Sequence, residues 1–205
     1  MPELNMKQLV LGPLRTNCYI LYNEKKEAVV IDPGDEYSRI KDMLLKDSLT
    51  PVAILLTHGH FDHIGAAAKL KETYGINIYA YMTEKEVLEK EELNLSVMFG
   101  MGITLKADIY LEDNEEVCIA GYDFKVIHTP GHTQGSCCYY LPSFEAIFSG
   151  DTLFSGTHGR SDFPTGSETT IIKSIRERLL VMDGDIDVFP GHEQSTTIED
   201  ERKWY

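Results

Sequence analysis

The chain contains a dense cluster of groups that bind metal ions. His58, His60, Asp62 and His63 fall within six residues, and three of the seven histidines are among them, which is too dense for an ordinary loop. Imidazole nitrogens and carboxylate oxygens are ligands of zinc and similar divalent metals. His58 and His60 alternate, so both would project to one side of an extended loop. Asp62 and His63 follow where the chain turns, so they could serve a second ion.

Three further candidate ligands occur later in the chain, and each follows a short apolar run and a glycine. Glycine permits a sharp turn and a close approach of the backbone to an ion. The complete candidate set is His58, His60, Asp62, His63, His132, Asp151 and His192. Five imidazoles and two carboxylates suffice for two divalent ions that share one carboxylate and leave a position for water. Such a pair can generate hydroxide near neutral pH and polarise a carbonyl, which is hydrolysis without a protein nucleophile.

The elements that would position these residues are short strands and amphipathic helices. Apolar runs bounded by turns predict strands at 6–11, 18–22, 28–31, 52–56, 76–81, 109–111, 117–120, 122–128, 136–141, 146–149 and 187–189. Apolar residues at helical spacing predict helices at 38–46, 67–74, 84–95, from a capping box at 165–168 to 179, and at 198–205. Each half runs from strands into helices, which predicts an α/β fold of two sheets packed face to face with helices on both outer surfaces.

Residues 83–105 contain an apolar, glycine-bearing stretch without a clear period. This stretch is either a simple connection or the wall of a substrate pocket, and the sequence favours neither.

Size and composition narrow the possible functions. The 205 residues, of which 42% are hydrophobic, predict a single domain with a full core. The net charge of -14 argues against a nucleic-acid partner, because neutralising phosphates requires clustered Lys and Arg. The chain shows no membrane-spanning stretch and no signal-peptide pattern, so we expect a cytoplasmic protein without a membrane partner. The four cysteines, Cys18, Cys118, Cys137 and Cys138, are predicted to be buried free thiols.

The motif His58-x-His60-x-Asp62-His63, followed in order by Gly131-His132, Gly150-Asp151 and Gly191-His192, resembles the metallo-β-lactamase-fold hydrolases. The resemblance covers nearly the whole chain and implies an αββα sandwich with two metals at one sheet edge. It implies that His58, His60 and His132 hold the first metal, and that Asp62, His63 and His192 hold the second, with Asp151 bridging. Asp62 would also orient the attacking hydroxide. The metals would be zinc, with iron or manganese as alternatives.

Further motifs resemble the glyoxalase II-like branch of that family, which typically hydrolyses thioesters such as S-lactoylglutathione. These motifs lie at 129–133, 150–154 and Gly159-Arg160-x-Asp162. Larger members add a C-terminal helical domain that contacts glutathione, whereas thirteen residues follow His192 here, so the resemblance implies an acyl-thiol substrate without specifying glutathione.

Other residues near the motifs have less certain roles. Arg160 is the candidate for binding an anionic substrate group, with a surface ion pair as the alternative. His158 is expected in an inert loop, and His128 in a structural or supporting role. Asp32 is expected to bond the far nitrogen of a metal-binding histidine.

Two other activities fit the same motifs. Persulfide dioxygenases resemble this branch and use one iron, which here would be held by His58, His132 and Asp151. Lactone or β-lactam hydrolysis fits less well, and a non-catalytic binding module would be expected to have lost ligands. The main prediction is therefore a dinuclear thioester hydrolase.

Overall fold

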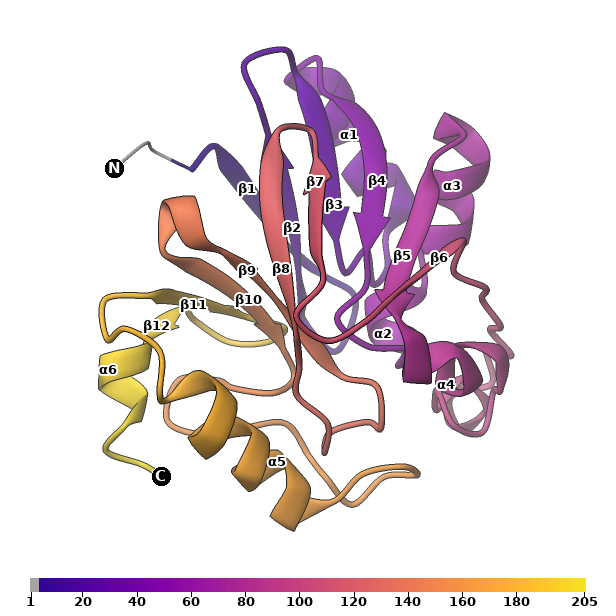
Figure 1. Ribbon diagram of the computed structural model, residues 1–205. Helices are drawn as coiled ribbons and strands as arrows, with labels where there is room; N and C mark the ends of the chain where they lie inside the picture. Colours follow the sequence, from indigo (N-terminus) through magenta and orange to yellow (C-terminus); the bar gives the residue numbers. More distant parts are fainter. Residues whose placement is uncertain (1–3) are drawn as a thin grey trace.

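Two β-sheets pack face to face in the computed structural model, which describes residues 4–205 (Figure 1). The first sheet has the strand order β1-β2-β3-β4-β5-β6, and the second has the order β12-β11-β10-β9-β8-β7. Each sheet contains parallel and antiparallel pairs of strands. In the first sheet, neighbouring strands from β1 to β3 are antiparallel and those from β3 to β6 are parallel. In the second sheet, β10 and β11 are parallel and the other neighbouring strands are antiparallel. The predicted sandwich of two mixed sheets is confirmed.

The strands are short and lie close to the predicted positions. Their bounds are β1 Met6–Leu11, β2 Thr16–Tyr22, β3 Glu27–Ile31, β4 Thr50–Leu55, β5 Asn77–Tyr81, β6 Ile109–Leu111, β7 Glu116–Ile119, β8 Tyr122–His128, β9 Cys137–Leu141, β10 Ala146–Gly150, β11 Asp187–Pro190 and β12 Thr196–Thr197. The two-residue strand β12 was not predicted, because a pair of threonines carries no alternating pattern.

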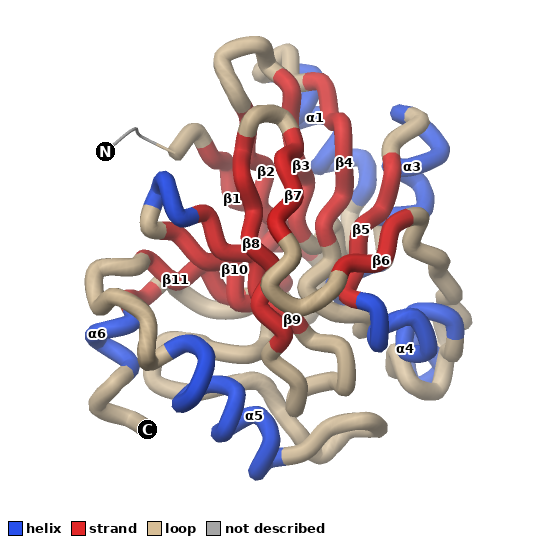
Figure 2. Tube along the Cα trace, viewed as in Figure 1, coloured by secondary structure: helices blue, strands red, loops and turns tan. Residues whose placement is uncertain are grey.

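Helices cover both outer faces of the sandwich (Figures 1 and 2). They are α1 Tyr37–Lys46, α2 Phe61–Ile64, α3 Ala67–Tyr74, α4 Lys85–Glu89, α5 Glu168–Ser174, which continues into a π-helical turn at Ile175–Leu179, and α6 Ile198–Glu201. Helices α1 and α3 pack on the first sheet through Ile40, Leu44 and Leu70. Helices α5 and α6 pack on the second sheet through Ile171 and Ile198. A third apolar cluster, which includes Phe124 and Tyr139, fills the space between the sheets.

Two helix predictions were wrong in extent. The helix predicted at 84–95 ends at Glu89, because Lys90 has an extended backbone conformation. Further on, the buried Asn94 side chain bonds the carbonyl of Ile103 and the amide of Ser96 instead of continuing a helix. The last helix ends at Glu201 rather than at Tyr205. In addition, α5 is capped by Ser167, whose hydroxyl accepts from the amide of Thr170, and not by the earlier threonine of the predicted capping box.

The cysteine prediction holds for three of the four thiols. Cys18, Cys137 and Cys138 are free and buried, whereas Cys118 is free and exposed. Cys118 lies on β7, which is the edge strand of the second sheet, and its side chain points to the solvent face of that strand. Within residues 4–205, the structure also contains no helix long and apolar enough to cross a membrane.

Candidate metal centre

The seven candidate ligands all lie at one end of the sandwich, in the segments that follow four strands, and two of them, Asp62 and His63, lie in the short helix α2. His58, His60, Asp62 and His63 follow β4 in the first sheet, and the other three follow β8, β10 and β11 in the second sheet. Contacts across the sandwich fix these loops, because the amide of Cys137 donates to the carbonyl of Thr57 and the Tyr139 hydroxyl donates to the carbonyl of Leu56. Packing of the two sheets therefore brings residues up to 134 positions apart into one site.

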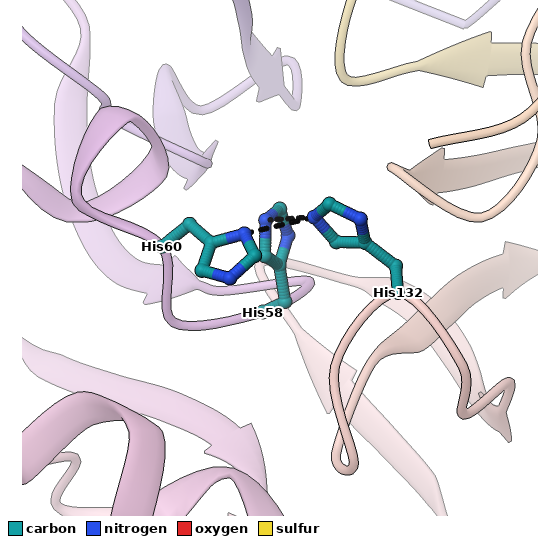
Figure 3. A group of neighbouring side chains, drawn as sticks. All are labelled: His58, His60 and His132. Carbon is teal, nitrogen blue, oxygen red and sulfur yellow. Dashed lines mark hydrogen bonds between the residues drawn. The ribbon is translucent and has the colours of Figure 1, made fainter. Parts of the chain in front are cut away.

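Three imidazoles form the first group (Figure 3). The Nδ1 atom of His60 lies 2.8 Å from Nε2 of His132, and the latter lies 3.2 Å from Nε2 of His58. All three side chains are at least 97% buried. Three ring nitrogens that converge on one point are arranged to share a single divalent cation.

Asp62, His63 and His192 form the second group. The Nε2 atoms of His63 and His192 lie 3.3 Å apart, and Oδ2 of Asp62 lies 3.3 Å from Nε2 of His192 and 3.6 Å from Nε2 of His63. One carboxylate oxygen and two imidazole nitrogens again make a set of three donors that fits a divalent transition metal.

Asp151 lies between the two groups. Its Oδ1 is 3.4 Å from Nε2 of His63, and its Oδ2 is 3.5 Å from Nε2 of both His132 and His192. Oδ1 is buried and has no hydrogen-bond partner within the described residues. Because a buried carboxylate oxygen without a partner is costly, this atom is itself an indication that a cation belongs beside it.

Hydrogen bonds on the far sides of the rings set the tautomers. Nδ1 of His132 lies 2.6 Å from the carbonyl oxygen of Arg160, and Nδ1 of His192 lies 3.1 Å from that of Leu14. A carbonyl only accepts, so in both rings Nδ1 carries the proton and Nε2 presents a lone pair to the site. His132 and His192 therefore have the orientation that metal binding requires.

Asp32 supports two neighbouring histidines, His63 directly and His58 through the Thr57 hydroxyl. Its Oδ2 accepts from Nδ1 of His63 at 2.9 Å and from the Thr57 hydroxyl at 2.6 Å, and its Oδ1 accepts from the Thr57 amide. The same hydroxyl oxygen lies 3.2 Å from Nδ1 of His58, so it can accept a hydrogen bond from that ring nitrogen. The expectation that Asp32 bonds a far nitrogen is confirmed, and Thr57 is an additional residue that the sequence did not reveal.

Replacing Asp32 by asparagine should weaken metal binding about 10- to 100-fold, because the amide is a poorer acceptor for the His63 ring and leaves one buried donor unpaired. Competition with a chromogenic chelator measures this affinity. Asp42→Asn on the exposed face of α1 is the matched control and should bind metal as the wild type does. Unchanged affinity in Asp32→Asn would show that the hydrogen bond does not orient the ligand.

The charges in the site favour a bound cation. Burial, together with neighbouring imidazoles, lowers the pKa of His58 and His60, so these rings are neutral and able to coordinate. Burial would raise the pKa of Asp62, but the imidazoles of His63 and His192 hold it at about 2. Burial would lower the pKa of His63, but the carboxylates of Asp62, Asp151 and Asp32 surround the ring and hold its pKa well above the usual range. The field that stabilises a proton there also stabilises a metal ion.

Glu84 is a site residue that the sequence analysis missed. Its carboxylate is fully buried and accepts from the Gly59 amide at 2.7 Å, from the Thr133 hydroxyl at 2.9 Å and from the Gly135 amide at 2.9 Å. Gly59 lies between two ligands of the first loop, and Thr133 follows His132. Glu84 therefore ties together the loops that carry the first group of imidazoles. The only sequence signal was a charged residue at the end of a buried strand.

An open cleft of mainly apolar lining leads to the ligands. It is lined by Leu14, His60, Phe61, Asp62, Leu95, Phe99, His132, Asp151, Phe154, Gly159, Arg160, Phe163 and His192. Leu95 and Phe99 belong to the stretch for which the sequence left two roles open, and the Phe99 ring packs against Phe61 at 4.4 Å between centroids. The stretch is therefore a wall of the cleft.

The other basic residues near the site have partners. The Arg160 guanidinium lies at the cleft but donates two hydrogen bonds to Asp162, of 2.9 and 2.7 Å, and stacks over Phe163. His158 bonds the Tyr205 hydroxyl and lies beside Glu168, outside the cleft lining. His128 stacks on Tyr81 and bonds the Gln134 carbonyl, as expected for a structural residue.

The family model of the metallo-beta-lactamase superfamily matches residues 11–192, the span that carries all seven candidate ligands. The chain belongs to the metallo-beta-lactamase superfamily. It is therefore a metallo-hydrolase-type protein, and its His/Asp clusters are those of a family that binds divalent metals.

Curated relatives cover almost the full chain. A probable metallo-hydrolase of Bacillus subtilis, YqgX, is 36% identical over 197 residues, which are 95% of this chain and 93% of the relative. The hydroxyacylglutathione hydrolase GloC of Haemophilus influenzae is 34% identical over 206 residues, which are 98% and 96% of the two chains.

Solved structures share the architecture closely. The BLEG-1 B3 metallo-beta-lactamase superposes with a TM-score of 0.92 at 41% identity, and 97% of this chain and 96% of that chain are covered. TTHA1623 in a di-iron-bound form superposes with a TM-score of 0.86 at 35% identity, over 96% and 97% of the two chains. The predicted family and fold are both confirmed.

Proposed function

We propose that this protein, folded as a single domain, is a dinuclear metal-dependent hydrolase of thioesters. The observation that carries the proposal is the pair of three-donor groups with the Asp151 carboxylate between them. His58, His60 and His132 would hold one ion, Asp62, His63 and His192 the other, and Asp151 would contact both. Two divalent ions bound there, as zinc, iron or manganese, would lower the pKa of water to near neutrality and polarise the substrate carbonyl.

The residues of the chain complete this chemistry. With its pKa at about 2, Asp62 is ionised at neutral pH, so it can accept a hydrogen bond from the attacking water and orient it. The Thr16 hydroxyl donates to Oδ2 of Asp62 at 2.9 Å and fixes the carboxylate plane. The apolar walls exclude bulk water from the carbonyl, which strengthens every charge interaction inside the cleft.

The leaving group favours a thioester over an amide. Among the described cleft residues, every titratable side chain except Arg160 belongs to the candidate ligand set, so the cleft contains no separate general acid. A thiolate, whose conjugate acid has a pKa of about 8.5, departs without protonation, whereas an amine requires a proton. The similarity to GloC supports the same reaction class.

Metal analysis and a substrate panel test the proposal. We expect two metal equivalents per chain and hydrolysis of S-lactoylglutathione or another acyl-thiol with kcat/KM above about 10⁴ M⁻¹ s⁻¹. The panel should include a lactone, a cephalosporin, and glutathione persulfide with oxygen uptake recorded. His132→Ala should abolish activity, and His158→Ala, outside the cleft lining, is its control. A folded, two-metal protein that hydrolyses no thioester, or one that consumes oxygen with the persulfide, would contradict the proposal.

A further inference from the structure

A second, more enclosed cavity adjoins the cleft, and we call it the side cavity. It has a volume of about 90 Å³ and is lined mainly by Leu11, Pro13, Leu14, Phe61, Met101 and Ile103. Leu14, Phe61 and Asp62 line both the cleft and the side cavity. A molecule whose reacting carbonyl lies at the ligands therefore has an apolar chamber directly beside it, on the side of Asp62.

Apart from the ions proposed at the ligands, the described residues of the side cavity and the cleft offer no unpaired arginine or lysine to a substrate. Arg160 is the only arginine or lysine among the described residues that line either space, and its guanidinium is paired with Asp162. The Asp35 carboxylate lies at the wall of the side cavity, and the whole chain carries a net charge of -14. An anionic group placed in the side cavity would lose its hydration beside the Asp35 and Asp62 carboxylates, and the described lining has no arginine or lysine to pair with it, which is strongly unfavourable.

An apolar rim extends from the side cavity to the surface. Val97, Met98, Phe99 and Met101 are each 49% to 68% exposed, and Phe99 reaches the cleft wall. Four large apolar side chains exposed in five residues are unusual on a protein surface and mark a binding area. The flexible methionines suit ligands of variable shape.

From these observations we propose that the substrate carries an uncharged, apolar arm of several carbons, and that this arm fills the side cavity. The inference rests on the proposed thioester hydrolysis and names its substrate class: thioesters in which the acyl group or the thiol is an alkyl chain, in preference to those of a charged peptide thiol. Aliphatic chains gain affinity by leaving water for an apolar enclosure, and each methylene group adds about fourfold.

Two substrate series test this inference. In one, a neutral small thiol carries acetyl, butyryl, hexanoyl and octanoyl groups, and in the other an acetyl group is joined to alkyl thiols of the same lengths. We expect kcat/KM to rise about fourfold per methylene in one series until the cavity is filled. Binding of the corresponding non-hydrolysable alkyl thioethers, measured by calorimetry on the metal-loaded protein, should follow the same trend.

A pair of exposed variants makes the test specific. Met101→Asp places a charge in the side cavity and should reduce the rise of kcat/KM from the shortest to the longest chain at least tenfold. Val181→Asp, at a 70% exposed site outside the cleft and the side cavity, should leave that rise unchanged. The inference would be wrong if kcat/KM and thioether affinity did not change with chain length while S-lactoylglutathione was hydrolysed well. Thioester hydrolysis itself would then still be supported. Length-dependent binding without any thioester hydrolysis would refute the activity and still support the apolar cavity.

Discussion

Asp151→Asn should lower the thioesterase kcat about a thousandfold and reduce the metal content from two equivalents to one or fewer. Asp151 lies within 3.5 Å of imidazoles from both groups, and its charge would balance two bound cations. An asparagine of the same shape is neutral and offers one oxygen. Loss of several kcal/mol of charge stabilisation in the transition state corresponds to about three orders of magnitude in rate.

The measurement combines metal analysis by mass spectrometry with steady-state kinetics on the same preparation. Asp187→Asn, at the exposed start of β11, is the matched control and should retain both metals and full activity. Since the two amides are isosteric with their carboxylates, neither variant should unfold. An Asp151→Asn protein that keeps two metals and acts within tenfold of the wild-type rate would show that Asp151 is not shared between the ions.

Glu84→Ala should lower the free energy of unfolding of the metal-free protein by about 3 kcal/mol or more. The substitution removes an acceptor from three buried donors, the Gly59 and Gly135 amides and the Thr133 hydroxyl. Each unpaired buried donor costs about 1 to 3 kcal/mol. Because the same bonds join the two loops of the first imidazole group, we also expect metal affinity to fall about 10- to 100-fold. Urea denaturation with a chelator present separates the two effects.

The control is Glu89→Ala at the end of α4, where the side chain is partly exposed and has no hydrogen-bond or ion-pair partner among the described residues, so it should change stability by less than about 0.5 kcal/mol. Equal stability of the Glu84 and Glu89 variants would show that the loops do not depend on this carboxylate. A Glu84→Gln variant retains the size of the side chain, so any loss of metal affinity in it reports the hydrogen bonds rather than a cavity.

The charge of Glu84 gives this prediction a pH dependence. Burial raises the pKa of Glu84 from 4.5 to about 7, against the opposing effect of its hydrogen bonds. Between those values the folded protein binds a proton that the unfolded chain has released, so stability falls as pH rises from about 4.5 to about 7. The Glu84→Gln variant lacks this group, so the wild-type advantage over it should shrink across that window.

The sequence alone predicted the family and the sandwich, and it named the seven residues that the structure brings to one site. This was possible because each candidate ligand lies just after an apolar run, at the end of a strand, and four of them lie in one loop. The ligands meet because β4, β8, β10 and β11 end at the same edge once the two sheets face each other, whereas the order of strands within each sheet was not predicted. The prediction that Cys118 is buried was wrong, because an edge strand exposes alternate side chains to solvent.

The tertiary structure alone decided how the ligands are held and what surrounds them. Glu84 contacts Gly59, 25 residues away, and Gly135, 51 residues away, and no spacing rule joins such positions. The stretch from Leu95 to Ile103 became a cleft and cavity wall only because it folds back over α2. Local spacing fixes which residue ends a strand, whereas contacts between loops depend on how the layers pack, and packing is set by the whole core rather than by any one segment.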